Sequence, residues 1–171
     1  MSGSLLADSF SERRINVGLK LFRIMLVADT NYQEKVSDKG YISIYLIYSS
    51  EKSNIARLEA RLSQSLTSLH DIPVQIESLS LDQYLNRNDN RSMGAFIAER
   101  LSALSLEKAI NKSIFNHQIL FSPFEGDVEA GVLGGVSVES KVKPFINMKT
   151  LKKSEVKIKN FYLKVAKQHD E

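Results

Sequence analysis

Apolar residues recur at a spacing of three and four along much of the chain, which is typical of helices with one buried face. Val17, Leu21 and Met25 form such a row in the segment from Ser9 to Ala28, where Ser9 or Ser11 is a candidate cap. A second row, with charged residues opposite it, runs through Ser53–Leu69. The pattern predicts helices at 9–28, 53–69, 101–114 and 160–167, and shorter ones at 81–85 and 148–153.

Short runs of apolar, aromatic and β-branched residues separate these helices and predict strands. Tyr41–Tyr48 (YISIYLIY) is apolar at nearly every position, which is typical of a central strand buried on both faces. Further strands are predicted at 74–79, 94–98, 117–121, 132–138 and 142–146. The last two are separated only by Glu139–Lys141 and predict a hairpin.

Alternation of strands and helices predicts an α/β fold: three layers, with a mostly parallel sheet flanked by helices and a C-terminal antiparallel hairpin. A length of 171 residues fits one domain, 1–171. Within it we expect an N-terminal helix region (1–28), alternating α/β elements (29–130), and a hairpin with terminal helices (131–171).

The formal net charge of +3 hides an asymmetry along the chain. The segment from Glu139 to Glu171 contains nine Lys and four acidic residues, whereas residues 1–138 are slightly acidic. Lys149, Lys152 and Lys153 fall on one side of the predicted short helix. A solvated face is the simplest interpretation; docking of an acidic partner or of anionic lipid headgroups is the alternative.

Binding of nucleic acid is not expected. Such sites combine lysine with arginine and stacking aromatic residues. No Arg follows Arg100, and we expect the two aromatic residues of the terminal helix, Phe161 and Tyr162, to be in the core.

The residue types also limit the chemistry. Cysteine is absent, which excludes disulfides, thiolate nucleophiles and Cys-ligated zinc. The histidines (His70, His117 and His169) form no zinc-binding motif, and no serine stands in a nucleophile elbow. The sequence therefore predicts neither an enzyme nor a bound metal or cofactor.

The loop from Ser122 to Gly131 is the best candidate ligand site, because ligands of open α/β sheets bind beyond the carboxyl ends of strands. Glu125 and Asp127 lie in it, and His117 opens the preceding predicted strand. An acidic, solvated loop is the simpler interpretation, since the calcium-loop pattern is incomplete. Gly134 and Gly135 match no phosphate loop and predict close backbone approach, and Asn147 predicts a helix cap.

No apolar run near the N-terminus has the composition of a signal peptide or the length of a membrane span. As the sequence stands, a cytoplasmic protein is expected. A chain from which a signal had been removed, with Met1–Ser4 as a vector remnant, would look the same and be periplasmic.

The C-terminal half resembles the YfiR-like family of small bacterial regulators. The segment Gly131–Val138 (GVLGGVSV) matches the Gly-Gly-containing apolar segment of that family, and Val142–Met148 (VKPFINM) matches its Phe-x-Ile-Asn-Leu core. A basic short helix and the terminal helix around Phe161–Ala166 follow in the same order. The likeness is specific over residues 95–168. The usual Trp-Pro after the first helix, the paired cysteines and the signal peptide are missing.

The resemblance implies a non-enzymatic protein, often dimeric, that binds and restrains a membrane-bound diguanylate cyclase or another signalling partner such as a histidine kinase. The alternative function is a sensor domain that binds a small molecule or anion at the Ser122–Gly131 loop.

Overall fold

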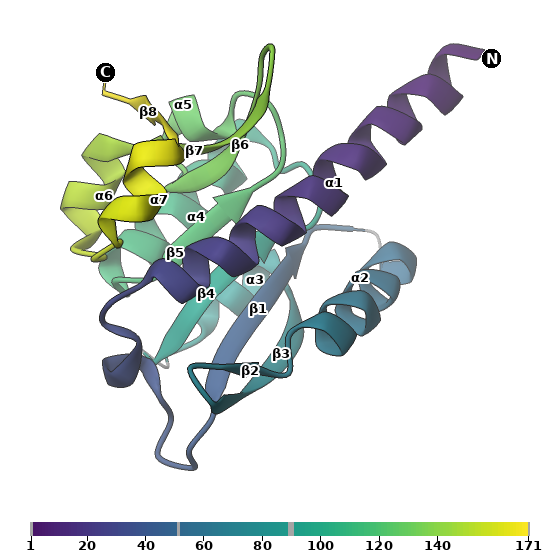
Figure 1. Ribbon diagram of the computed structural model, residues 1–171. Helices are drawn as coiled ribbons and strands as arrows, with labels where there is room; N and C mark the ends of the chain where they lie inside the picture. Colours follow the sequence, from purple (N-terminus) through teal and green to yellow (C-terminus); the bar gives the residue numbers. More distant parts are fainter. Residues whose placement is uncertain (1, 51, 89–90, 171) are drawn as a thin grey trace.

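An eight-stranded sheet forms the centre of the computed structural model, which describes residues 2–50, 52–88 and 91–170, without the side chains of 2–11 and 52–54. The strand order is β2-β3-β1-β4-β5-β6-β7-β8. Helices cover both faces (Figure 1), so the predicted three-layer α/β architecture is confirmed. Met1, the first residue of the segment considered as a vector remnant, and residues 89–90 lie outside the described residues.

Five neighbouring strands run parallel: β3 (Ile72–Ser80), β1 (Ile42–Tyr48), β4 (Ser92–Ile97), β5 (Ile119–Ser122) and β6 (Gly134–Val138). The strand β7 (Val142–Asn147) is antiparallel to β6, as the predicted hairpin requires. Two short strands complete the edges. These are β2 (Ser68–Leu69), antiparallel to β3, and β8 (Lys167–His169), parallel to β7.

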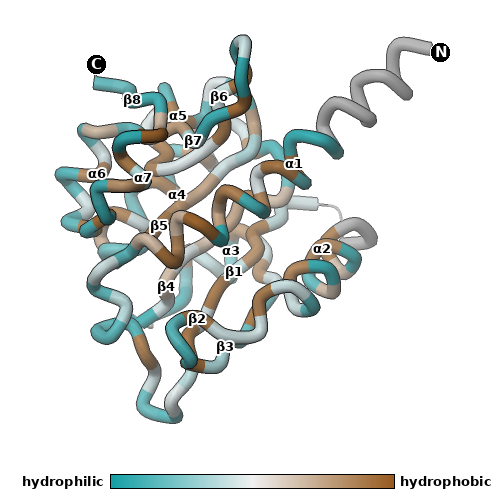
Figure 2. Tube along the Cα trace, in the orientation of Figure 1, coloured by the Kyte–Doolittle hydropathy of each residue, from teal (hydrophilic) through white to brown (hydrophobic). Residues whose placement is uncertain are grey.

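Two apolar cores lie on opposite sides of the sheet. The helices α1 (Ser2–Ala28), α2 (Lys52–Ser65) and α7 (Asn160–Val165) pack on one side, and α3 (Leu81–Asn86) and α4 (Ala103–Phe115) on the other. Ile42, Ile44 and Leu46 of β1 contribute to the first core, while Tyr45 and Ile47 contribute to the second. Successive residues of a strand point to opposite faces, so a strand buried on both faces, such as β1, needs apolar or aromatic side chains at nearly every position, here all except Ser43 (Figure 2).

The remaining helices are short: η1 (Tyr32–Lys35), α5 (Asp127–Ala130) and α6 (Met148–Ser154). Asn147 caps α6 by accepting a hydrogen bond from the Thr150 backbone N–H at 2.9 Å, which confirms the predicted cap. None of the helices in the described part of the chain has the length and apolar character needed to cross a membrane.

Some predicted element boundaries are wrong. The first helix begins at Ser2 instead of Ser9, and the second ends at Ser65, so Leu69 belongs to β2. His70 and Asp71 have φ values of 51° and 65° and form the two-residue turn between β2 and β3. Asn and Gly usually provide these left-handed conformations, which is why the sequence did not indicate a turn here.

Candidate functional site

The predicted ligand residues do not come together in one site. Glu125 and Asp127 follow β5 at the carboxyl edge of the parallel strands, whereas His117 precedes β5 at the amino edge. His117 has a φ of 53° and lies in the turn before the strand, not within it as predicted. A whole strand separates the two edges, so His117 cannot share a ligand with Asp127.

Asp127 is buried beneath its loop. The Ser122 hydroxyl donates a 2.6 Å hydrogen bond to the Asp127 carboxylate and accepts one from the Phe124 N–H at 3.1 Å. Burial raises the pKa of Asp127, while the bond from Ser122 and the positive charges of Arg100 and Arg14 act in the opposite direction. Through these contacts Asp127 stabilises the conformation of the loop. The side chain of Glu125, by contrast, is exposed to solvent.

Two arginines hold the same loop to the rest of the molecule. The Arg14 guanidinium of α1 donates to the carbonyl oxygens of Pro123 at 2.7 Å and Val136 at 3.2 Å. The Arg100 guanidinium donates to the Glu125 carbonyl at 3.3 Å and lies 5.3 Å from the centre of the Phe124 ring. The cavity beside this loop has a volume of about 140 Å³. Sites for organic ligands usually measure about 300–1,000 Å³, so this cavity is small for one.

No group of three His, Asp or Glu side chains that could hold a metal ion occurs among the described residues.

Asp127 leads to a pH-dependent prediction. A pKa raised on folding contributes stability that is present below the unfolded value of about 3.9 and is lost as the pH rises through the folded pKa. The variant Asp127→Asn has no carboxyl group at this position and so does not lose this stability. As the pH rises from 4 to 7, the free energy of unfolding of the variant should therefore increase relative to that of the original chain. Urea denaturation at several pH values measures the difference. The exposed Glu125→Gln is the control, and an equal trend in both variants would contradict the prediction.

A carboxylate of the chain itself occupies the point where the strand order reverses. The strands β1 and β4 are neighbours, and the connection after β1 leads to β3 on one side of the sheet, whereas the connection after β4 leads to β5 on the other side. Ligands of open α/β sheets bind at the carboxyl ends of two strands whose connections diverge in this way. Here Glu99 accepts hydrogen bonds from the backbone N–H groups of Ser49 at 2.7 Å and Ser50 at 2.9 Å, and from the Ser50 hydroxyl at 2.8 Å. Glu99 was not among the predicted site residues, although its position directly after the predicted strand 94–98 is a usable indication.

A larger cavity lies at the opposite, amino edge, and we call it the amino-edge cavity. Its volume is about 710 Å³. Lys35 and Asn31 from the segment after α1, Lys152 from α6, and Val156 from the loop after α6 contribute to its walls together with His117. The sequence does not indicate this site, because the polar segment 29–39 contains no recognisable motif.

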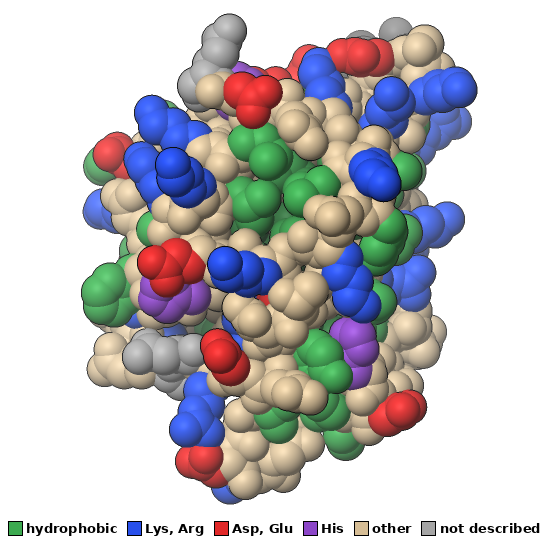
Figure 3. All heavy atoms as spheres, turned by 60° about the vertical axis from the view of Figure 1, so that its left-hand side comes forward, with side chains coloured by type: hydrophobic (Ala, Val, Ile, Leu, Met, Phe, Trp, Pro, Cys, Tyr) green, Lys and Arg blue, Asp and Glu red, His purple; other side chains and the backbone are tan. Residues whose placement is uncertain are grey.

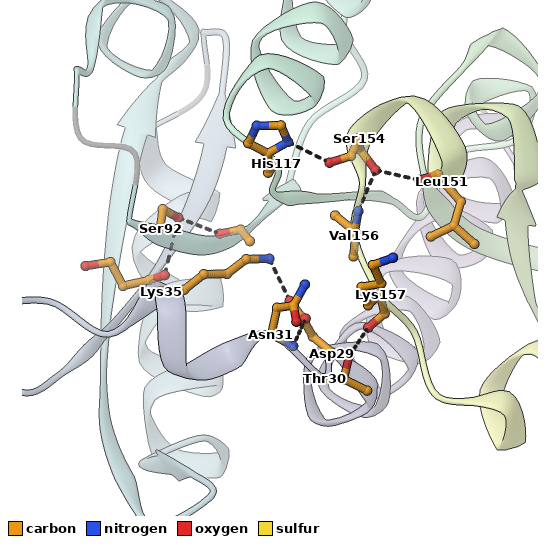
Figure 4. Close-up of polar contacts among 12 residues, drawn as sticks. Asp29, Thr30, Asn31, Lys35, Ser92, His117, Leu151, Ser154, Val156 and Lys157 are labelled. Carbon is orange, nitrogen blue, oxygen red and sulfur yellow. Dashed lines mark hydrogen bonds and ion pairs between the residues drawn. The ribbon is translucent and has the colours of Figure 1, made fainter.

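A buried ion pair lies beside the amino-edge cavity (Figure 4). The Lys35 ammonium is 2.6 Å from the Asp29 carboxylate, and their side chains are 9% and 0% exposed. The other carboxylate oxygen of Asp29 accepts from the Asn31 N–H at 2.9 Å. Across the cavity, Nδ1 of His117 is 2.9 Å from the Ser154 carbonyl oxygen, which links the turn before β5 to the end of α6.

The three predicted docking lysines are exposed on α6, but they line different hollows. Lys149 and Lys153 border a cavity of about 520 Å³ between α6 and α4, whereas Lys152 borders the amino-edge cavity. The helix turns only 100° per residue, so side chains on one side of it can still flank two neighbouring grooves.

An apolar surface also extends over α1 and α7, and we call it the α1–α7 face. Its exposed members are Ile24 (45%) and Val27 (41%) on α1, and Phe161 (50%) and Val165 (56%) on α7. The prediction that Phe161 lies in the core is therefore wrong, while Tyr162 is fully buried there. Figure 3 shows apolar side chains gathered on this side of the molecule, with Lys and Arg side chains along most of the border and an acidic side chain at its upper edge.

Comparisons with known proteins bear on the fold alone. Neither protein-family models nor curated proteins match the sequence. The ABC domain from Streptococcus pneumonia in complex with L-Trp is structurally similar, with a TM-score of 0.54 and 12% identity over 84% of this chain. A conserved domain protein from Vibrio cholerae O1 biovar eltor is similar with a TM-score of 0.59 and 13% identity over 83% of this chain. This chain spans 61% and 60% of those two chains, and it shares their α/β fold.

Proposed function

We propose that this chain is a non-enzymatic regulatory protein that binds and restrains a signalling enzyme, either a membrane-bound diguanylate cyclase or a histidine kinase. The resemblance to YfiR-like regulators motivates the proposal. The observation that supports it best is the set of exposed apolar side chains on the α1–α7 face, because exposed apolar patches on a folded domain are typical of interaction sites.

Backbone hydrogen bonds hold the two helices of this face in a fixed relation. The Thr30 N–H donates to the Lys157 carbonyl oxygen at 2.9 Å, and the Lys159 N–H donates to the Ala28 carbonyl oxygen at 2.9 Å. These bonds join the end of α1 to the start of α7, which lie side by side in Figure 1. The relative positions of the apolar side chains on the two helices are therefore fixed before a partner binds, which lowers the entropic cost of binding.

Charge indicates the kind of partner. Lys20 on α1 and Lys157, Lys159 and Lys164 at α7 are all exposed around the apolar side chains. An amphipathic helix with acidic residues beside its apolar stripe would complement this face, since the apolar stripe supplies binding energy and the charges favour fast and correct encounter. We propose such a helix of the signalling enzyme as the occupant.

Site-specific photo-crosslinking in cells that produce the protein tests this proposal. A photoreactive amino acid at position 161 or 165 should crosslink to one protein, identified by mass spectrometry as a cyclase or kinase. The same amino acid at position 115 is the matched control, because Phe115 is 76% exposed on α4, on the other side of the sheet. A second copy of this chain as the sole product, or equal products from positions 115 and 161, would overturn the proposal.

Purified components then provide a quantitative test. The substitutions Ile24→Glu and Phe161→Glu should each weaken binding to the identified enzyme about tenfold or more, because a charge would replace an apolar contact and oppose an acidic partner. Phe115→Glu should leave the affinity within about twofold, and circular dichroism should show all three variants folded. Unchanged affinity of Ile24→Glu and Phe161→Glu would exclude the α1–α7 face.

The alternative function, a sensor with its site at the Ser122–Gly131 loop, has less support. Asp127 is engaged by Ser122, and the adjoining cavity of about 140 Å³ has little room for an organic molecule.

A further inference from the structure

We propose that the amino-edge cavity binds a small organic anion, with the anionic group of the ligand on the Lys35 ammonium and its apolar part against Met148, Leu151 and Val156. This site shares Lys157 at its rim with the α1–α7 face but has its own lining residues, so it adds a ligand to the proposed regulatory function and does not depend on it.

The cavity has the size and construction of a ligand site. Its volume of about 710 Å³ lies within the range of about 300–1,000 Å³ usual for small-molecule sites. Three segments far apart in the sequence form it: the region of η1, the turn at His117, and the region from Met148 to Lys157. The His117–Ser154 and Thr30–Lys157 hydrogen bonds join these segments around the cavity, so its shape does not depend on a single loop.

The buried charged side chain in the cavity lining is Lys35, and its ion-pair partner Asp29 offsets part of its attraction for an anion. Lys35 lines the cavity and is only 7% exposed as a residue. Its ammonium carries three N–H donors, and the acceptor seen for it in the described part of the chain is the Asp29 carboxylate. Figure 4 shows the ammonium end of Lys35 reaching toward Asp29 and Asn31 from the opposite side to Val156. A ligand carboxylate or phosphate would accept hydrogen bonds from the other N–H groups of the Lys35 ammonium. Such charge-assisted hydrogen bonds are stronger than those between neutral groups.

The other lining groups agree with an organic anion. Met148, Leu151 and Val156 are apolar and partly or fully buried, which provides a wall for a hydrocarbon or aromatic body. The remaining lysines of the cavity, Lys152 and Lys157, are exposed and add positive charge at its mouth. Glu34 and Glu155 lie at the same exposed rim and offset the charges of Lys152 and Lys157, so recognition of an anion relies on the hydrogen-bond donors of Lys35.

A set of probes with the same body and different end groups tests the ligand class. In a ¹⁵N NMR titration, 3-phenylpropionate or 3-phenylpropyl phosphate should shift the amide signals of Asn31, Leu151 and Val156. The alcohol 3-phenylpropanol and the amine 3-phenylpropylamine should bind about tenfold more weakly or not at all, because neither can accept from Lys35 as an anion does. Comparing the carboxylate with the phosphate distinguishes the two anionic groups, and inorganic phosphate alone tests whether the apolar body is needed.

Three variants locate the binding. The double variant Asp29→Asn with Lys35→Met removes the buried charges at nearly constant volume and should reduce 3-phenylpropionate affinity about tenfold or more. Leu151→Trp fills part of the cavity and should also abolish binding, which keeps the test decisive if the double variant does not fold. Lys153→Met is the matched control, because Lys153 borders the other hollow, and it should change the affinity less than about twofold.

Three results would overturn the proposal. Equal binding of 3-phenylpropanol and 3-phenylpropionate would show that the charge has no role. Amide shifts that avoid the amino-edge cavity would place the site elsewhere. No shift at about 10 mM of any probe, a concentration that fills even millimolar sites, would show that the cavity takes no ligand of this class.

Discussion

Replacement of Lys35 by Met should lower the free energy of unfolding by about 3–5 kcal/mol, the usual cost of removing one partner of a buried ion pair. The Asp29 carboxylate is fully buried and loses its cation in this variant. It retains the backbone N–H of Asn31 as a donor, which is too little to compensate a buried negative charge. Urea denaturation at pH 7 measures the loss.

Two further variants separate this mechanism from a general loss of packing. Asp29→Asn combined with Lys35→Met should recover most of the lost stability, because no unpaired charge then remains buried. Lys39→Met is the control: Lys39 is exposed a few residues away, so its substitution should change stability by less than about 0.5 kcal/mol. If Lys35→Met and Lys39→Met were equally stable, the ion pair would have no structural importance.

Replacement of Gly135 by Ala should destabilise the fold by about 1–3 kcal/mol, as overpacking of a tight core does. Gly135 pairs with Ser122 of the neighbouring parallel strand. A Cβ atom at position 135 would be 2.5 Å from the Val128 side chain and 2.8 Å from the Ser122 carbonyl oxygen. The side chain can move, but the carbonyl belongs to β5 and cannot move without disturbing the sheet.

Thermal unfolding of Gly135→Ala should show a lower Tm, and Val138→Ala provides the comparison on the same strand. Val138 is 55% exposed, so its truncation should leave Tm almost unchanged. Adding Val128→Ala to Gly135→Ala should restore little stability, because the contact with the carbonyl persists and a core side chain is lost. Full recovery in that double variant would show that side-chain crowding alone excludes a larger residue at position 135.

The strength of the local pattern decided which elements could be predicted. The run Tyr41–Tyr48 predicted a strand buried on both faces, and β1 indeed contributes to both cores. Asn147 was predicted as a cap because capping needs only a partner three residues away. The strand β8 was missed, since its three polar residues (Lys167–His169) form a strand only by pairing with β7.

The candidate sites were harder to predict than the fold. His117 and Asp127 are ten positions apart in the sequence, and they were grouped for that reason, yet β5 carries them to opposite edges of the sheet. The Asp29–Lys35 pair had no sequence pattern to distinguish it from a solvated polar loop. Phe161 was assigned to the core because it is aromatic, but α7 turns it toward solvent.

Local patterns were enough to predict the α/β class, the order of most elements and the hairpin, and composition was enough to locate the lysine-rich C-terminal segment, because these depend on residue types and on residues within one or two turns of each other. The three-dimensional arrangement was needed to learn which edge of the sheet is hollow, which carboxylates are buried, and which apolar side chains remain on the surface. Those features arise where the order β3-β1-β4-β5-β6-β7 brings segments such as Asn31–Lys35, His117 and Met148–Lys157 together. The periodic spacing of residues predicts local helices and strands, but it does not predict contacts between segments that are far apart in the sequence.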